Sequence, residues 1–461
     1  MNKIACMIVA ALMVSGCSLA PTYQRPENVT APDWSSIQGG ASTKTDQGLV
    51  TDIPWKTFFL SQDLQTVIQT ALSNNRDLKK AVLSVQKTQA LYNIERSKLL
   101  PDLNAAGTGD YQSDFHGNAV DKYQAGLAMP YYEIDFFGRI DSLGNVALNQ
   151  YLATDEARKS ITISLIAQAA NACLQLTSDL QTLEMSKDSL ETRQQTYELV
   201  NKSCQNGVAT KQDLSQARIA LESARVNTIL FTRLVLLDKN ALVAIMGTKG
   251  FSVPMSTALD ETAVMEEIPG GLSSEVLLKR PDILGAEYSL KAAGANIGAA
   301  RAAFYPRIAL TGNLGYSSSD LGDLFSSSDN AGLGIGPSIS VPIFNGQRNK
   351  TLLKAAKIDQ KIAVVQYENT LQLAFKEVAD ALAARKTLGQ QLEAQRMLVR
   401  ASQDAYDLSM KRYNEGIDSF LSVLDAQRSL FASQTAEIDL QRQELANRVS
   451  LYKVLGGGLA H

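Results

Sequence analysis

Histidine is nearly absent from this sequence of 461 residues. The only two, His116 and His461, lie far apart. Two histidines so far apart make histidine-based catalysis and a histidine-rich metal site improbable. The sequence also shows no Ser/His/Asp pattern and no pair of carboxylates placed for catalysis. The net charge of −3 gives no reason to expect a nucleic-acid partner. We expect no enzymatic activity, no catalytic residue and no metal site.

Long hydrophobic runs are also missing beyond the N-terminus. The best candidate for a transmembrane helix, Ile229–Met246, is interrupted by Arg233, Asp238 and Lys239. A helix that crosses a bilayer needs about 20 predominantly apolar residues. We expect no transmembrane helix in the mature chain.

The N-terminus carries a short apolar segment of the kind that directs export. A charged start, an apolar run and a small-residue end predict a signal peptide over residues 1–16. The order Val14-Ser15-Gly16-Cys17 resembles the bacterial lipobox, in which the cysteine receives diacylglycerol and an N-acyl chain. Residues 17–61 are then a lipid-anchored extended segment, and Ser18 after the cysteine favours the outer membrane. The alternative is an ordinary signal with an incidental Cys17.

Proline is absent from two stretches of more than a hundred residues. All twelve prolines lie outside 131–253 and 343–461. Proline is the residue least tolerated inside a helix, so both stretches should be mostly helical. Apolar residues fall every seven positions in each stretch, which predicts coiled-coil packing. The range Arg139–Gln205 would then form a helix about 100 Å long. Cys173 and Cys204 on this helix are about 46 Å apart, too far for a disulfide.

The sequence repeats itself. "RSKLLPDLNAAGTGDY" (96–111) matches "RAAFYPRIALTGNLGY" (301–316) at an offset of 205, and later matches keep an offset of 208 or 209. We interpret this as duplication. The predicted parts are repeat 1 over 62–247, a connector over 248–271, repeat 2 over 272–457 and a C-terminal tail over 458–461.

Each long helix should break at one tip and restart. The breaks fall at Asn206-Gly207 and at Glu415-Gly416, because glycine suits the left-handed position that ends a helix. Thr210 and Ser419 occupy matching positions and are placed to cap the next helix. Each repeat should therefore contain a helical hairpin.

Between its first and its long helix, each repeat holds two short segments of alternating apolar and small residues. They span 103–112 and 123–135 in repeat 1, and 308–317 and 333–343 in repeat 2. Their length and period of two suit transmembrane β-strands, although a soluble hairpin on a helical bundle would fit the strands equally well. Four strands are too few to close a barrel, and an open edge is not tolerated in lipid. Neighbouring chains must complete it, from a dimer upwards.

Six motifs together resemble the TolC/OprM family of outer-membrane factors, in its lipoprotein (NodT/OprM) branch. They are "CSLAPTYQRP" (17–26), "EIDFFGR" (133–139), "LLKRPDI" (277–283), "ANIGAARAAFYPRIALTG" (295–312), "VPIFNGQRN" (341–349) and "RYNEGIDSFLSVLDAQRSLF" (412–431). The resemblance implies an α+β membrane protein with four transmembrane strands per chain. A homotrimer would complete a twelve-stranded barrel, continuous with a long α-helical coiled-coil barrel.

The same resemblance implies a function and partners. The chain would be the passive outer-membrane exit duct of a tripartite efflux system for antibiotics and other toxic compounds. Its partners would be a periplasmic adaptor (membrane fusion) protein and an inner-membrane resistance-nodulation-division (RND) transporter. Two alternatives stay open: the same architecture exporting copper or silver ions, and a non-conducting lipid-anchored coiled-coil protein of the envelope.

Two aspartates after the second tip are candidates for a periplasmic gate. Asp418 and Asp425 lie one heptad apart, so they share a face if the helix has begun by then, and symmetry would repeat them as acidic rings. Relatives in the resembled family carry aspartates in this region. The alternatives are a solvated Asp418 beside Ser419 and an Asp425 paired with Arg428. The tips Asn206-Gly207 and Glu415-Gly416 are candidates for adaptor docking or purely structural turns.

Overall fold

The protein is described by a computed structural model that covers residues 19–26, 53–113, 119–250, 255–265 and 274–458. The predicted signal peptide and Cys17 lie outside the described residues. The elements, in chain order, are α2 (Trp55–Phe58), α3 (Gln62–Asn74), α4 (Arg76–Ser97), β1 (Asn104–Ser113), β2 (Ala119–Ile134), α5 (Arg139–Gln205), α6 (Lys211–Met246), η3 (Ser274–Lys279), α7 (Pro281–Ala302), β3 (Arg307–Ser318), η4 (Ser328–Asn330), β4 (Ala331–Ser340), α8 (Arg348–Asn414) and α9 (Phe420–Val454).

The chain forms two compact units, and neither coincides with one half of the sequence. The first unit combines the ranges 1–29, 83–156 and 284–369, and the second combines 30–82, 157–283 and 370–461. Each unit therefore takes segments from both halves of the chain. Helices α5 and α8, of 67 residues each, contribute to both units.

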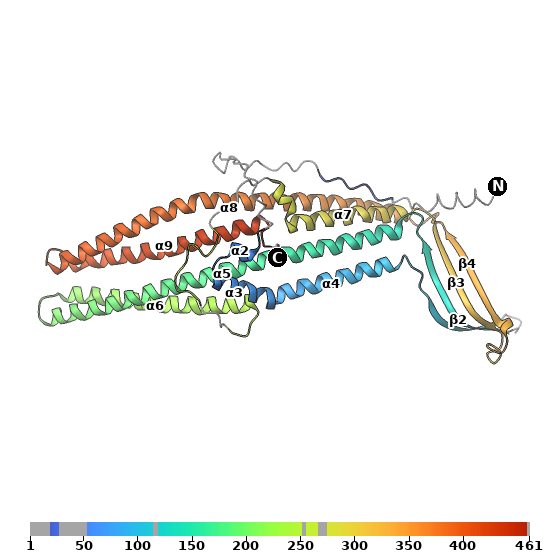
Figure 1. Ribbon diagram of the computed structural model, residues 1–461, viewed down its shortest axis with the longest axis horizontal. Helices are drawn as coiled ribbons and strands as arrows, with labels where there is room; N and C mark the ends of the chain where they lie inside the picture. The colour runs from blue at the N-terminus through green and yellow to red at the C-terminus, as the bar shows by residue number, and fades with distance from the viewer. Residues whose placement is uncertain (1–18, 27–52, 114–118, 251–254, 266–273, 459–461) are drawn as a thin grey trace. The chain divides into compact units, whose positions relative to one another are not determined.

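The first unit contains a single antiparallel sheet with the strand order β1-β2-β3-β4. Each strand thus pairs with its neighbours in chain order, and β2 and β3 join the two halves of the chain, as Figure 1 shows. The strands overlap the predicted ranges, with the largest differences at the start of β2, which is Ala119 rather than 123, and at the end of β4, which is Ser340 rather than 343. Ser340 pairs with Arg307, the first residue of β3, so β4 ends where its partner strand begins.

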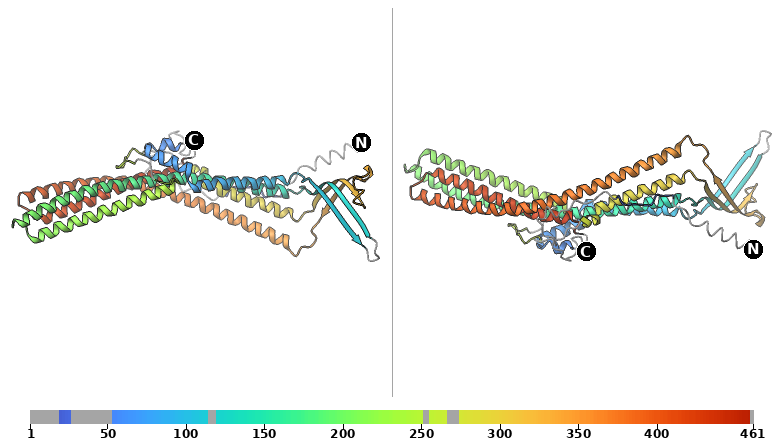
Figure 2. Two further views of the ribbon diagram at one scale, coloured as in Figure 1. Left: turned by 90° about the horizontal axis from the view of Figure 1, so that it is seen from below. Right: turned by 90° about the horizontal axis from the view of Figure 1, so that it is seen from above.

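The two long helices occupy the predicted stretches. Helix α5 spans the range expected from the absence of proline, and α8 has the same length. In the second unit α5 and α6 form one hairpin and α8 and α9 form another, seen in both Figure 1 and Figure 2. Gly207 and Gly416 have φ angles of 75° and 74°, the left-handed conformation that the tips need.

No helix in the described part of the chain combines the length and the apolar character that crossing a bilayer requires.

The caps of the two returning helices differ. Thr210 caps α6 as expected, and its hydroxyl and the Asp213 carboxylate form a reciprocal capping box. The expectation for Ser419 is wrong, because its side chain makes no capping hydrogen bond to α9. An ion pair between Arg412 and Asp418 closes this second turn instead.

The core of the second unit is built from both halves of the sequence. Near the tips, Val200 and Ala217 from the first half pack with Phe420 and Val423 from the second. Cys173 is buried and Cys204 half-buried, and both are free thiols, as their predicted separation requires. The two hairpins are therefore held together by an apolar seam.

Candidate functional site

One face of the sheet is apolar and exposed. Leu127, Leu314 and Leu333 are directly opposite one another on β2, β3 and β4, so they form one row. Each of these three side chains is more than half exposed. Other large apolar side chains exposed on the same face are Tyr111, Tyr316, Ile335 and Ile339. An apolar face of this kind, which no other described segment covers, fits contact with lipid.

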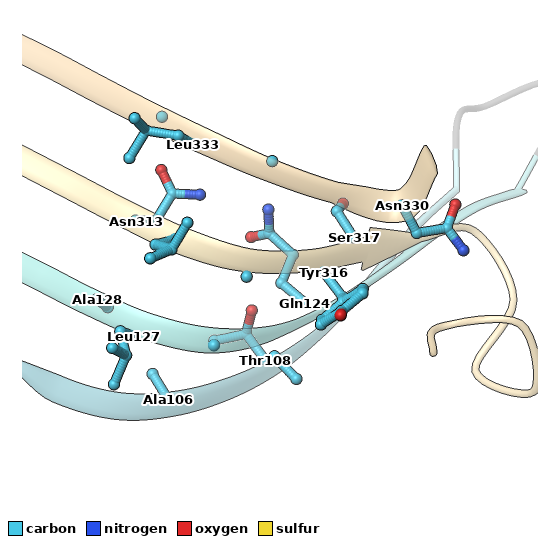
Figure 3. Close-up of a pocket in the computed structure, with 16 residues that line it drawn as sticks. Ala106, Thr108, Gln124, Leu127, Ala128, Asn313, Tyr316, Ser317, Asn330 and Leu333 are labelled. Carbon is cyan, nitrogen blue, oxygen red and sulfur yellow. The ribbon is translucent and has the colours of Figure 1, made fainter. Parts of the chain in front are cut away.

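The opposite face of the sheet is polar and lined by small residues. Thr108, Gln124 and Ser317 form one row across β1, β2 and β3, and Asn313 lies two rows further along the same face, opposite Ala128. They line a hollow of about 440 Å³, drawn in Figure 3. Gly126 and Gly315 lie opposite each other in it, and a Cβ on either would collide with the other strand's backbone. The polar face therefore suits water or a solute.

Aromatic side chains gather at both ends of the sheet. Tyr111, Tyr123 and Tyr316 lie toward the loop end, whereas Tyr131 and Tyr132 lie toward the helices. Tyr123 and Tyr132 are on the apolar face and pair with Ser318 and Leu310 of β3, which are eight residues apart, about 26 Å along a strand. Transmembrane strands have an apolar band about 25 Å tall between two aromatic girdles. The sheet has the dimensions of a membrane-spanning wall.

The motif 133–139 fastens the sheet to helix α5. The Arg139 guanidinium donates two hydrogen bonds of 2.7 Å to the Glu133 carboxylate, whose side chain is only 6% exposed. The Asp135 carboxylate accepts hydrogen bonds from the backbone N–H groups of Arg139 and Asp141. The ring of Phe137 stacks on Tyr305 with the centroids 4.7 Å apart. This short segment therefore fixes how the strand turns into the helix.

The two hairpin tips present similar surfaces. A Cβ on Gly207 or Gly416 would meet open space, so nothing within the described chain covers either turn. The next residue is an exposed apolar one in both tips: Val208 is 83% exposed and Ile417 is 59% exposed. The predicted tip residues Asn206 and Glu415 are also exposed. Exposed apolar side chains at matching positions are the feature that a docking surface would use.

The candidate gate residue Asp418 is held by a cation of its own chain. The Arg412 guanidinium donates to both carboxylate oxygens of Asp418, at 2.6 and 2.9 Å. This hydrogen bond from Arg412 holds the pKa of Asp418 below its usual range. Asp418 is therefore ionised at neutral pH.

The second candidate, Asp425, pairs with Arg428 one turn further along α9, at 2.7 Å. Helix α9 begins at Phe420, so Asp418 lies in the turn before it. The heptad argument therefore does not by itself place Asp418 and Asp425 on one face.

Several functional contacts escaped the sequence reasoning. Arg412, Arg139 and Glu133 make the ion pairs just described, yet only their membership of the motifs 133–139 and 412–431 drew attention to them. Within the described ranges, no three His, Cys, Asp or Glu side chains gather as a metal site would need.

Comparison with known proteins agrees with this geometry. The family model described as "Outer membrane efflux protein" matches residues 67–248 and again residues 272–457. The chain belongs to the outer membrane efflux protein family.

Individual members of the outer membrane efflux protein family match over nearly the whole chain. The antibiotic efflux pump outer membrane protein ArpC and the toluene efflux pump outer membrane protein TtgC, both from Pseudomonas putida, are each 43% identical. Each match covers 98% of this chain and 95% of the relative. The crystal structure of the open state of the Neisseria gonorrhoeae MtrE outer membrane channel is 36% identical, with a TM-score of 0.87, covering 96% of this chain and 99% of that one.

Family membership establishes the general role. The protein is an α+β outer-membrane channel of an efflux system, and it resides in the outer membrane. The wall of an outer-membrane channel needs one apolar and one polar face, and the sheet has both.

Proposed function

We propose that the protein is the exit duct of a tripartite pump and that three copies build it. The observation that carries this proposal is the order of the sheet, β1-β2-β3-β4, which leaves one edge of β1 and one edge of β4 without a partner strand among the described residues. An open strand edge is not tolerated in lipid. Strand β4 runs antiparallel to β1, so β4 of one copy can pair with β1 of the next. Three copies give the twelve-stranded barrel that the family resemblance implies.

The helices next to the two free edges support this arrangement. Helix α4 leads into β1, and α8 follows β4 after a short loop. In the first unit each exposes apolar side chains at helical spacing. On α4 these are Leu83, Leu91 and Ile94, and on α8 they are Ile358, Ile362 and Val365. Helices with an uncovered apolar row pack against a neighbour. A neighbouring copy is the partner that symmetry supplies.

We infer that Asp418 and Asp425 form the periplasmic gate. Threefold repetition at a narrow mouth would give rings of like charge, which favour cations. Within each chain, Arg412 and Arg428 pair with these aspartates and partly neutralise their charge. Opening would then require the aspartates to exchange their partners in these exposed ion pairs.

We further propose that the tips Asn206-Gly207 and Glu415-Gly416 dock a periplasmic adaptor protein, which connects the duct to an inner-membrane RND transporter. The exposed Val208 and Ile417 support docking at these tips. Cys17 would carry the covalent lipid, the only added group that we expect.

The cargo is proposed to be antibiotics and apolar toxic compounds, by analogy with ArpC and TtgC. The duct itself would carry out no reaction; movement would be driven by the transporter.

The proposal is tested by purifying the chain in mild detergent and reconstituting it in planar bilayers. We expect trimers, and a low conductance that rises when Asp418→Ala and Asp425→Ala are combined. A monomer with no conductance in either form would refute the duct and favour a non-conducting envelope protein.

The cargo is tested by deleting the gene and measuring survival on antibiotics, detergents, organic solvents, and copper and silver salts. Sensitivity to the organic compounds alone is expected. Sensitivity confined to the metal salts would overturn the cargo assignment.

A further inference from the structure

A stripe of four lysines runs along α8 just after the sheet. Lys350, Lys354, Lys357 and Lys361 are spaced by four, three and four residues, so they lie within one face of the helix. All four are exposed, and all four belong to the first unit. We call them the α8 lysine stripe.

The α8 lysine stripe has no counter-charge within ion-pair distance in the part of the chain that the structure describes. Among the ion pairs of the described residues, none involves any of the four lysines. The acidic residue inside this stretch, Asp359, follows Lys357 by two positions and so points to the other side of the helix. In a protein whose net charge is −3, four unpaired cations on one face form a local basic surface.

Duplication does not explain the α8 lysine stripe. The corresponding first turns of α5, residues 139–157, contain no lysine. The two helices share their length and their position after a strand pair. Repeat 2 therefore carries a charged surface that the architecture alone does not require.

The N-terminal strap, residues 19–26, indicates which way the α8 lysine stripe faces. Arg301 donates to the Leu19 carbonyl at 2.8 Å, and Arg25 pairs with Glu287 at 2.7 Å, so α7 holds the strap at two points. The ring of Tyr23 also lies 4.9 Å from the Lys291 ammonium.

The strap and α8 meet along one hollow, which is lined by Tyr23 together with Gln360 and Val364. Gln360 follows Lys357 by three positions, and Val364 follows Lys361 by three, so the α8 lysine stripe borders the strap's side of the helix. If the protein is the proposed duct, this side is the outside, because the strap leads to the lipid-bearing Cys17. The α8 lysine stripe then faces the periplasm below the outer membrane.

The length of the α8 lysine stripe decides between two anionic partners. Lys350 and Lys361 are separated by about 16 Å along the helix axis. At physiological ionic strength, charges more than about 8 Å apart are largely screened from each other. Lipid headgroups near Lys350 would therefore not interact with the lysines at the far end of the stripe. An extended polyanion can contact all four lysines.

We propose that the α8 lysine stripe binds the carboxylate-bearing glycan-peptide polymer of the cell wall, peptidoglycan. Its peptide stems present repeated carboxylates in the periplasm, where a duct of this length must pass through the polymer. Ammonium groups on exposed, flexible side chains bind such carboxylates without a preformed pocket. The contact would tether the duct to the wall, and it rests on the proposed function for the outward orientation and for the passage through the periplasm.

The test is co-sedimentation of the full-length protein in detergent with isolated, insoluble peptidoglycan sacculi at low and high salt. Four exposed ion pairs predict that replacing all four lysines by glutamine weakens binding about tenfold. The variant with four arginines should bind like the parent. A matched control removes the same charge from exposed lysines elsewhere, at Lys79, Lys87, Lys249 and Lys386. That control should bind like the parent.

Three results would overturn the proposal. The first is equal binding by the stripe variant and its matched control. The second is undiminished binding to sacculi whose carboxyl groups have been amidated. The third is stripe-dependent binding to phosphatidylglycerol vesicles with none to sacculi, which would make a lipid surface the partner. Bilayer conductance separates this proposal from the duct: the four-glutamine variant should conduct like the parent.

Discussion

Asn75 and Arg280 occupy matching places in the two halves of the chain but use different chemistry. The Asn75 amide donates to the Ile245 carbonyl at 2.8 Å, and Arg280 donates to the Val454 carbonyl at 2.9 Å. Ile245 and Val454 are themselves 209 residues apart, the offset of the repeat. Arg280 adds ion pairs with Asp282 and Glu377, whereas Asn75 adds only a neutral cap on the Leu78 N–H.

The two hairpin tips also differ in the polar contacts that secure them. Thr210 and Asp213 close the first tip with a capping box, and Arg412 and Asp418 close the second with an ion pair. Duplication has thus kept the backbone arrangement and changed the polar contacts that secure it. The ion pair at the second tip joins two opposite full charges and weakens with salt, whereas the Asp213 carboxylate at the first tip bonds to the uncharged N–H and hydroxyl of Thr210 and depends less on salt. The second hairpin should therefore respond more to ionic conditions than the first.

At one site the charge lies in the first half instead. Asp238 on α6 faces Asp179 on α5, and its Oδ2 atom is buried without a hydrogen-bond donor among the described residues. Burial and the adjacent Asp179 raise the pKa of Asp238 to about 7. The matching residue in the second half is neutral Asn447, whose amide donates to the Ala381 carbonyl. The first half therefore contains a proton-dependent contact that the second lacks.

The two halves should differ most in the stability that is lost when the side chains of Arg280 and Asn75 are removed. We expect Arg280→Ala to lower the free energy of unfolding by about 2–3 kcal/mol, since it removes a buried, charge-assisted hydrogen bond. Asn75→Ala should cost about 1 kcal/mol. Denaturant unfolding followed by circular dichroism in detergent measures both. Arg280→Lys, which keeps the charge but loses the planar fork, should fall between them; equal losses for both alanine variants would contradict the comparison.

The next largest effect should be a pH dependence that belongs to the first half. Because the pKa of Asp238 is raised in the folded chain, folding takes up a proton between about pH 4 and pH 7, so the free energy of unfolding falls as the pH rises through that window. Asp238→Asn should flatten this fall and stabilise the protein at pH 8 by about 1–2 kcal/mol, allowing for partial exposure.

Thermal unfolding at several pH values measures this effect. Asn447→Asp is the matched control and should introduce a similar fall into the second half. An unchanged pH profile in Asp238→Asn would show that neither burial nor Asp179 raises the pKa of Asp238 in the folded chain.

A smaller effect should separate the two capping positions. Thr210→Ala removes a cap that the structure contains, and we expect a loss of about 1 kcal/mol. Ser419→Ala removes no capping bond, and its loss should be close to zero. Parallel unfolding curves of the two variants provide the measurement, and a similar loss for Ser419→Ala would argue that this residue caps α9 in solution.

The smallest effect on stability should come from the exposed pair at the second tip. Arg412→Gln should raise hydrogen exchange about two- to fivefold in peptides that contain residues 417–424, because the turn loses its ion pair. High salt should produce the same increase in the parent protein. Since Arg412 holds the pKa of Asp418 below its usual range, pH 5 should not reproduce it. Peptides from the first tip, around Val208, serve as the control and should not change.

The architecture could be predicted from the sequence because it depends on local signals. The absence of proline predicted where α5 and α8 lie, and glycine predicted the tips at Gly207 and Gly416. The alternation of apolar and small residues located the strands to within a few positions.

The polar contacts could not be predicted in the same way, because they join residues distant in sequence. Arg25 and Glu287 are 262 positions apart, and Arg280 and Val454 are 174 apart. Ser419 is a residue type that often caps helices, but its side chain makes no capping bond. The ion pair between Arg412, on the preceding helix, and Asp418 closes the turn instead. For the candidate gate, the sequence supplied the aspartates and the pairing of Asp425 with Arg428, but it did not identify Arg412 as the partner of Asp418.

The unpaired edges of β1 and β4 also have a genetic consequence. In the proposed trimer, strands β1 and β4 of each copy pair with strands of the two other copies. A defect in one copy therefore affects the whole trimer. A cell that makes intact and defective versions in equal amounts would assemble only about one duct in eight entirely from intact copies. Loss-of-function alleles that still fold and associate should therefore behave as dominant, whereas alleles that abolish folding should be recessive.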